Sequence, residues 1–260
     1  MKINVHAGHN PDGKIACGAI GLIKESTEAR KVATKVIELL RNEGHTVYDC
    51  TVDNGISQSN VLTKIVNKCN AHTVDLDVSI HFNAGRNDKK GDDSTGGTEV
   101  LVYNASSKAM DEAERICKRI SALGLRNRGI KTNKSLYFLK KTKAPALLVE
   151  CCFVDDADDI KKYNYETMAK AIVEGILNKT ISAPANNTTT TTNTSATGNF
   201  KVKVTTNTLN IRSGAGTNCK IVGCITNKGT YTITKTSGSW GYLKSGAGWI
   251  NISTEYVKYV

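Results

Sequence analysis

The sequence lacks the hydrophobic segments that place a protein in or across a membrane. Nowhere in its 260 residues do about 18 apolar residues follow one another, so no membrane-spanning segment is expected. The N-terminus, MKINVHAGHN, also lacks the long apolar stretch of a signal peptide. We therefore expect synthesis in the cytoplasm without a signal peptide, and any action outside the cell then needs another exit route.

The motifs of two common kinds of binding site are also missing. The eight cysteines include no C-x-x-C pair, which argues against a zinc site built from thiolates. Neither G-x-x-x-x-G-K-[ST] nor G-x-G-x-x-G occurs, so no phosphate-binding loop is expected. Given the chain length and the missing signal peptide, we expect buried or inert thiols rather than a disulfide framework.

One segment lacks charge altogether. Residues 182–199, SAPANNTTTTTNTSATGN, carry no ionisable side chain and few apolar ones, which predicts a flexible linker between residues 1–181 and 200–260. The two parts differ in charge. Residues 200–260 hold eight Lys or Arg and one Glu, a net +7, which leaves +4 of the total +11 for residues 1–199. A small basic module indicates an anionic partner.

The first part alternates between strand-like and helix-like segments. Helical spacing predicts helices at residues 25–42, ending at Gly44, and at residues 59–71, 106–125 and 157–178. Between them lie the strand-like segments INVHA, HTVYDC, LDVSIHF, TEVLVYN, SLYFLKKT and APALLVECCF. This order predicts an α/β domain with a mostly parallel sheet and helices on both faces. Residues 200–260 have short Val-, Ile-, Thr- and Tyr-rich runs between Gly, Asn and Ser, which predicts a small all-β barrel or sandwich.

Polar side chains stand at the ends of three predicted strands, where sites form in open α/β sheets. His9 follows the first strand, His81 lies near the end of LDVSIHF, and Glu150 interrupts the apolar run APALLVECCF. Glu25 opens the first long helix, where an acid is also favoured by the helix dipole alone. Two imidazoles and one carboxylate suit a catalytic zinc, and a second carboxylate would serve as general base.

The motifs around these residues resemble the zinc-dependent N-acetylmuramoyl-L-alanine amidases of bacterial cell-wall turnover, a family that includes autolysins and phage endolysins. The resemblance covers most of residues 1–178, through AGHN, KESTEARKVATKVIELLRNEGHTV, SIHFNA and APALLVECCFVDD, with GGTEVLVY and NRGIK as further segments. It implies a phosphorylase/hydrolase-like fold and one Zn²⁺ held by His9, Glu25 and His81. It selects Glu25 over Glu28 as the ligand and makes Glu150 the catalytic carboxylate.

The resemblance also implies a substrate and a reaction. The substrate is peptidoglycan, and the reaction hydrolyses the amide bond between N-acetylmuramic acid and L-alanine of the stem peptide, which lyses the wall. Without a signal peptide, this describes a phage or prophage endolysin of a Gram-positive host, released through a holin-like pore or by lysis. The alternatives are a zinc exopeptidase that trims stem peptides and a non-enzymatic wall-binding protein. No nucleic-acid partner is expected.

Three other residues near these motifs are candidates for supporting roles. Asn10 follows His9 where the family often has glycine, so it is a candidate substrate contact. Asn83 would orient the metal site, touch the substrate or simply form a turn. His6, three residues before His9, is expected to point to the opposite face of the strand and to pack there or support the site.

Residues 203–259 resemble the bacterial SH3 (SH3b) domains of cell-wall enzymes. TLNIRSGAGTNCKIVGCITNKGTYTI is similar to their opening segment, and WGYLKSGAGWINISTEYV is similar to their closing one. The resemblance implies a cell-wall-binding module at residues 200–260, with Trp240, Trp249 and Arg212 as candidate contacts to an anionic or peptide wall ligand.

Overall fold

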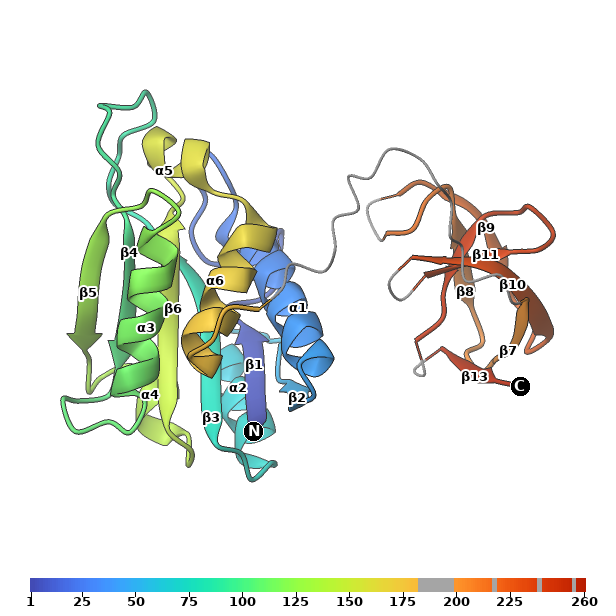
Figure 1. The fold of residues 1–260 in the computed structure, drawn as a ribbon, viewed down its shortest axis with the longest axis horizontal. Helices are drawn as coiled ribbons and strands as arrows, with labels where there is room; N and C mark the ends of the chain where they lie inside the picture. Colours follow the sequence, from blue (N-terminus) through green and yellow to red (C-terminus); the bar gives the residue numbers. More distant parts are fainter. Residues whose placement is uncertain (182–198, 217–218, 238–239, 254–255) are drawn as a thin grey trace. The chain divides into compact units, whose positions relative to one another are not determined.

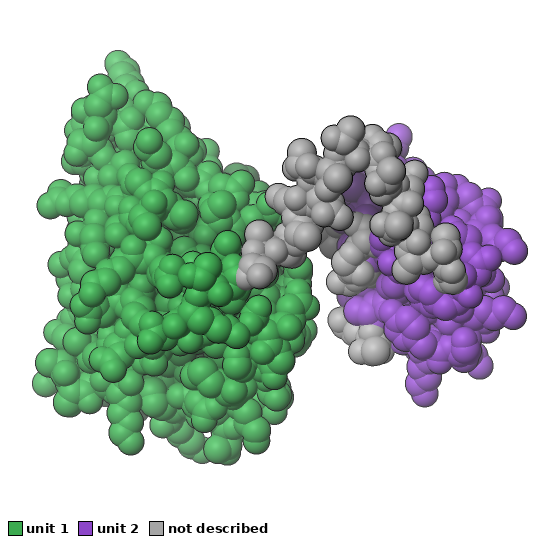
Figure 2. Space-filling model, in the orientation of Figure 1, with its two compact units in different colours: residues 1–185 green, residues 186–260 purple. Residues whose placement is uncertain are grey.

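The computed structural model describes residues 1–181, 199–216, 219–237, 240–253 and 256–260. The chain divides into two compact units, residues 1–185 and 186–260 (Figure 2). The predicted flexible linker at residues 182–199 lies outside the described residues, apart from Asn199. Among the described helices, none combines the length and the apolar character needed to cross a membrane.

The first unit is built on a six-stranded sheet with the order β2-β1-β3-β6-β4-β5 (Figure 1). Its strands are β1 (Lys2–Ala7), β2 (Thr46–Asp49), β3 (Leu76–Asn83), β4 (Thr98–Val102), β5 (Asn127–Thr132) and β6 (Ala146–Phe153). Four neighbouring pairs are parallel, but β4 runs antiparallel to β6. The sheet is therefore mixed, since its β4 and β5 edge is reversed relative to the other four strands.

Helices cover both faces of this sheet, as the alternation of segments predicts. On one face lie α1 (Glu25–Asn42), α3 (Met110–Ser121) and α6 (Tyr165–Leu177), and on the other lie α2 (Gln58–Asn70) and α4 (Tyr137–Lys141) (Figure 1). The strands alternate accordingly. Ile3, Val5, Val78 and Ile80 join the large core against α1, α3 and α6. Their neighbours point to the α2 and α4 face, where polar side chains lie beside a smaller apolar core.

The helix boundaries confirm the prediction for α1, shorten the helix predicted at 106–125 to α3, and divide the helix predicted at 157–178. Helix α1 spans the predicted residues 25–42, and Gly44 follows it with φ +82°, the left-handed conformation that glycine adopts readily. The predicted helix at 157–178 is two helices, α5 (Ala157–Lys162) and α6. Tyr163 and Asn164 are extended between them, and the Asn164 side chain accepts N–H groups at the start of α6.

The segment SLYFLKKT, predicted as a strand, is instead the short helix α4 (Tyr137–Lys141). The Asn133 side chain accepts the N–H groups of Ser135 and Leu136, which starts a turn rather than an extended strand. The consecutive side chains of Phe138 and Leu139 are both buried in the core beneath α2, as helical spacing allows and strand alternation does not.

The second unit is all β, and its seven strands form an antiparallel sheet with the order β13-β7-β10-β11-β12-β8-β9. They are β7 (Phe200–Val204), β8 (Leu209–Arg212), β9 (Ile221–Ile225), β10 (Thr230–Ser237), β11 (Trp240–Leu243), β12 (Trp249–Asn251) and β13 (Val257–Tyr259). No pairing among the described residues joins β9 to β13, so the predicted barrel is not closed there. A separate apolar core, which includes Val202, Ile233, Ile250 and Val257, holds this unit together.

Candidate active site

Three of the predicted site residues meet at the carboxyl ends of β1 and β3. The Glu25 Oε1 atom lies 3.2 Å from His9 Nε2 and 3.0 Å from His81 Nδ1. One ligand atom from each residue falls within 4.8 Å of the others, and the two imidazole rings lie edge to face with their centroids 4.8 Å apart. Residues separated by up to 72 positions in the sequence thus form one cluster of nitrogen and oxygen donors.

Backbone groups hold the Glu25 carboxylate in place at the first residue of α1. Its Oε2 atom accepts the Ala19 N–H at 2.8 Å, and its Oε1 atom accepts the Phe82 N–H at 3.2 Å. Burial raises the pKa of Glu25, but the hydrogen bonds from His81 and His9 outweigh it and hold the pKa below its usual value. Glu25 is therefore ionised in this position, as a metal ligand must be.

Two glycines make room for the cluster. A Cβ atom at Gly8 would overlap the His81 ring, and one at Gly18 would lie 2.8 Å from His9 Cδ2. His9 itself has φ +65°, a conformation unusual for a residue with a side chain, at the turn that follows β1. Glu28 lies elsewhere, because its carboxylate binds Lys31 and the Tyr163 hydroxyl. Glu25, and not Glu28, is thus the acid that reaches the histidines.

Glu150 lies beside this cluster on the same face of the sheet. It is the register partner of His81 across β3 and β6, and of Glu99 across β6 and β4. Its Oε2 atom is buried and has no hydrogen-bond partner among the described residues. Burial, followed by the charges of Glu25 and Glu99, raises the pKa of Glu150 to about 8. A carboxyl group with this pKa can take up and release a proton near neutral pH.

A cavity of about 270 Å³ opens beside these side chains, between the sheet and the helices α2 and α4. His9, His81 and Glu150 line one end of it. Apolar side chains of α2 and α4 form most of the remaining wall, among them Val61, Leu62, Ile65 and Phe138. A substrate at the histidine cluster would therefore have an apolar compartment next to its reacting bond.

His6 lies on the floor of this cavity, which corrects the prediction that it points away from the site. His6 and Ser79 are register partners on β1 and β3 and share the sheet face of His81 and Glu150. The expectation failed because His9 is not part of β1: the chain turns at Gly8 and His9, so strand alternation does not relate His6 to His9.

Asn10 does not have the position of a substrate contact, whereas the roles suggested for Asn83 stay predictions. Asn10 is completely buried, its amide donates to the carbonyls of Ile15 and Gly55, and its Oδ1 atom accepts the Gly55 N–H. Asn10 therefore ties two loops together and does not face a substrate. Asn83 is half-buried and donates to Glu99 Oε1 at 3.0 Å.

Glu99 was missed as a site residue, although the sequence carried a signal for it. Its Oε2 atom pairs with Arg128 Nε at 2.8 Å, and the Arg128 guanidinium lies over the Phe153 ring. Glu99 interrupts the apolar strand TEVLV, as Glu150 interrupts APALLVECCF. The same argument that selected Glu150, a carboxylate within a buried strand, applies to both.

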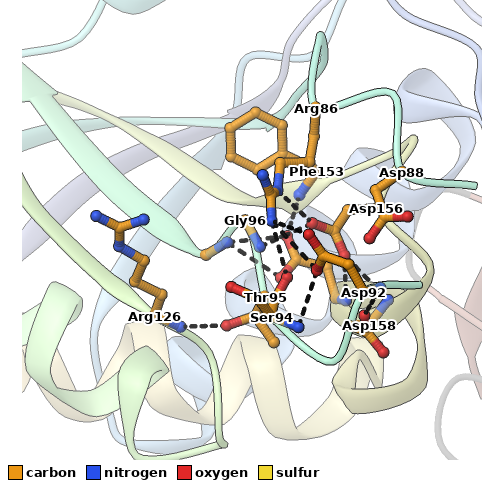
Figure 3. A network of polar contacts seen from close by, with 12 residues as sticks. Arg86, Asp88, Asp92, Ser94, Thr95, Gly96, Arg126, Phe153, Asp156 and Asp158 are labelled. Carbon is orange, nitrogen blue, oxygen red and sulfur yellow. Dashed lines mark hydrogen bonds and ion pairs between the residues drawn. The ribbon is translucent and has the colours of Figure 1, made fainter.

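A separate cluster of carboxylates contacts the loop between β3 and β4 (Figure 3). Asp156 is fully buried, and its Oδ2 atom accepts from Arg86 Nε at 3.1 Å. Asp158 pairs with Lys161 at 2.8 Å. Together with Asp88, these carboxylates offer ligand atoms within 4.8 Å of one another. Arg86 and Lys161 balance two of the three negative charges. The contact between Arg86 and Asp156 joins the loop to the segment that follows β6 (Figure 3).

In the second unit, the three predicted wall-binding residues lie on neighbouring strands. Trp249 is the register partner of both Tyr242 and Arg212, and Trp240 stands two residues before Tyr242 on β11. Strand alternation therefore puts all four side chains on one face of the sheet. Both tryptophans are partly exposed, and the Lys235 ammonium lies over the Tyr242 ring. This face combines aromatic surface with positive charge.

An α/β domain that joins two imidazoles and two carboxylates near the carboxyl ends of its strands, one of the carboxylates coming from the start of a helix, has the chemistry of a hydrolase. The chain matches the family described as N-acetylmuramoyl-L-alanine amidase over residues 3–180, and it belongs to that family. The match ends before the second unit, so the SH3b resemblance of residues 203–259 stays a prediction.

Similar proteins include both phage and bacterial wall enzymes. An endolysin of Bacillus phage SPP1 is 29% identical over 65% of this chain and 60% of its own length. The N-acetylmuramoyl-L-alanine amidase LytC of Bacillus subtilis is 30% identical over 69% of this chain and 35% of its own. An uncharacterized 38.4 kDa protein of Clostridium perfringens is 39% identical over 70% of this chain and 54% of its own. The chain spans about half the length of the curated relatives it matches.

Solved structures share the fold of the first unit. The catalytic domain of the CD27L endolysin, which targets Clostridia difficile, is 31% identical with a TM-score of 0.63, over 70% of this chain and 99% of that domain. The amidase AmiC2 of Nostoc punctiforme shows the same fold at 24% identity, with a TM-score of 0.56 over 68% of this chain and 96% of its own.

Proposed function

We propose that this protein is a zinc-dependent N-acetylmuramoyl-L-alanine amidase that cleaves the bond between N-acetylmuramic acid and L-alanine in peptidoglycan. The observation that carries the proposal is the meeting of His9, Glu25 and His81, with Glu150 adjoining them on the same sheet face. Family membership supports the reaction class. The metal, the site roles and the biological setting are parts of the proposal.

The donor set fits zinc. Two imidazole nitrogens and one ionised carboxylate are ligands that catalytic zinc sites use, with a further coordination position left for water or substrate. Gly8 and Gly18 leave space around the donors that a Cβ atom would fill. A zinc ion bound by His9, Glu25 and His81 would polarise the amide carbonyl and make a water molecule a better nucleophile at neutral pH.

The protein's own part in the reaction is to orient the amide and to move one proton. The Glu150 carboxylate takes the proton from the attacking water and then delivers it to the alanine nitrogen, which leaves as an amine. In the metal-free protein burial raises the pKa of Glu150 to about 8, and a cation bound at the neighbouring cluster would lower it toward neutral pH, where both transfers are feasible. The mostly apolar cavity would give the group next to the reacting bond an apolar environment.

The second unit would hold the enzyme on the wall. Residues 200–260 carry a net +7, and their aromatic and basic face suits an anionic or peptide ligand of the wall. Binding there would raise the local concentration of the first unit at its substrate. In this proposal the protein is a phage or prophage endolysin of a Gram-positive host, made in the cytoplasm and acting on the wall after release.

Metal analysis together with product identification on purified walls tests the proposal. We expect one zinc per chain, and digestion that leaves free lactyl groups on the sugars and new N-terminal L-alanine on the peptides. Peptides shortened at other positions would instead indicate the exopeptidase. A zinc-free chain that binds walls without releasing any product would indicate a wall-binding protein.

A further inference from the structure

Three polar side-chain atoms in the floor and end of the cavity have no hydrogen-bond partner among the described residues. They are His6 Nε2, Ser79 Oγ and Glu150 Oε2. His6 is 1% exposed and Ser79 is fully buried. A buried polar group without a partner destabilises the folded state, so three of them around one cavity require an explanation. The proposed mechanism uses Glu150 and leaves His6 and Ser79 unexplained.

The chemistry of His6 is fixed by its surroundings. Burial, followed by the charge of His81, lowers the pKa of His6 to about 3, so the ring is neutral at physiological pH. Its Nδ1 atom lies 3.2 Å from the Ala7 carbonyl oxygen. A carbonyl only accepts, so Nδ1 carries the proton and donates it. The Nε2 atom at the cavity is therefore a hydrogen-bond acceptor that suits an N–H or O–H group of a ligand.

The walls of the cavity select the kind of ligand. Val61, Leu62 and Leu148 present only aliphatic groups, and polar atoms are few. A sugar ring has a hydroxyl at most positions, and most of these would lose their hydrogen bonds to water here without replacement. A small aliphatic amino-acid residue has one apolar side chain and one peptide group, which matches aliphatic walls with a few polar atoms.

We propose that His6 and Ser79 form a specificity pair that binds the first residue of the released peptide, resting on the amidase function proposed above. The His6 Nε2 atom accepts the peptide N–H that follows this residue, and the Ser79 hydroxyl donates to its carbonyl. The methyl side chain of alanine packs against Val61, Leu62 and Leu148. His6 thus places the amine side of the scissile bond next to Glu150.

Two synthetic N-acetylmuramoyl tripeptides test this contact. One is the natural peptide, and in the other the amide N–H after the first residue is replaced by an ester oxygen, which removes the donor without adding bulk. For the wild type we expect kcat/KM about tenfold lower with the ester, the value of one hydrogen bond at a buried acceptor. For His6→Phe, which retains a ring against Phe138, we expect the two compounds to differ less than twofold.

His72→Phe is the matched control, because this histidine stacks on Tyr48 away from the cavity. We expect it to discriminate between the two compounds as the wild type does. His6→Phe removes an unpaired buried nitrogen, so its Tm should not fall by more than a few degrees, in contrast to a variant whose fold is damaged.

A second variant tests the cavity without altering its floor. Leu62→Trp on α2 fills the cavity from a half-buried position, and we expect at least a tenfold loss of kcat/KM on both compounds with unchanged metal content. The proposal would be overturned if His6→Phe kept the wild-type kcat/KM ratio between the two compounds, or if Leu62→Trp kept full activity. Either result would assign the unpaired atoms to bound water. If the wild type does not cleave the natural compound at all, the amidase function itself is contradicted instead.

Discussion

The two units differ in how many polar side chains they bury. The first unit buries Asn4, His6, Glu25, Asp77 and other polar or charged residues, whereas no polar or charged residue is buried among the described residues of the second. All the ion pairs found in the described chain also lie in the first unit. The second unit has a small apolar core and keeps its lysines at the surface or partly exposed.

This difference separates a reaction site from a binding surface. Burying ionisable groups costs folding free energy but places them in an environment of low dielectric constant, where their pKa values and mutual attraction change strongly. Exposed charges change little in pKa but act at a distance on an anionic surface. The first unit therefore suits catalysis, and the exposed charges of the second are consistent with the adhesive role proposed for it.

Removing one of the three proposed zinc ligands should have the largest effect. In His81→Ala we expect loss of bound zinc and a fall in amidase activity to about one-thousandth or less, because carbonyl polarisation is lost. Zinc content by atomic absorption and lactyl-end release measure the two effects. Binding of the intact chain to walls should remain, since the second unit is unchanged; loss of wall binding would show that the units are not separable in this way.

Glu150→Gln should have the next largest effect and should separate metal binding from proton transfer. We expect zinc content to be unchanged and activity to fall about 10²- to 10⁴-fold, the usual contribution of a general base. The amide of glutamine has the shape of the carboxylate but cannot take up the proton. A folded, zinc-loaded Glu150→Gln enzyme with near-normal turnover contradicts the role of Glu150.

Removal of the second unit should have a smaller effect that depends on the substrate and the salt concentration. For a chain of residues 1–181 we expect full activity on soluble muramoyl peptides and roughly 10- to 100-fold lower activity on intact walls, because the avidity contribution is lost. Raising the salt concentration should lower wall activity of the whole chain more than that of the fragment. Equal activity on walls would exclude the second unit as an adhesion module.

The smallest effect concerns pH and stability of the metal-free protein. The folded-state pKa of Glu150, about 8, lies above its ordinary value of 4.5, so the proton stabilises the fold. This stabilisation is complete below pH 4.5 and is lost as the pH rises through 8. Chelator-treated wild type should therefore lose roughly several degrees of Tm relative to Glu150→Gln between pH 5 and pH 9. A constant difference across this range would show that Glu150 is not held in a buried environment.

Much of the site was predictable because its chemistry and its position in the strands coincide. His9, His81 and Glu150 stand at or near strand ends, where side chains of neighbouring strands meet, and Glu25 opens a helix whose apolar spacing is regular. The segment SLYFLKKT, which contains helix α4 (Tyr137–Lys141), was misread as a strand because a short apolar segment does not by itself distinguish a strand from a single helical turn.

The sequence alone determined which residue types are present and in what local pattern: a basic β-rich segment, an alternating α/β segment, and imidazoles and carboxylates at predictable ends. The tertiary structure decided which of these side chains lie close together in one site. Asn10 turns inward and His6 lies on the cavity floor. The contact between Glu25 and the histidines, which the family resemblance implied, is also made only in the folded chain. These outcomes depend on strand register and on the turn at Gly8 and His9, and the contacts that fix them come from residues distant in the chain.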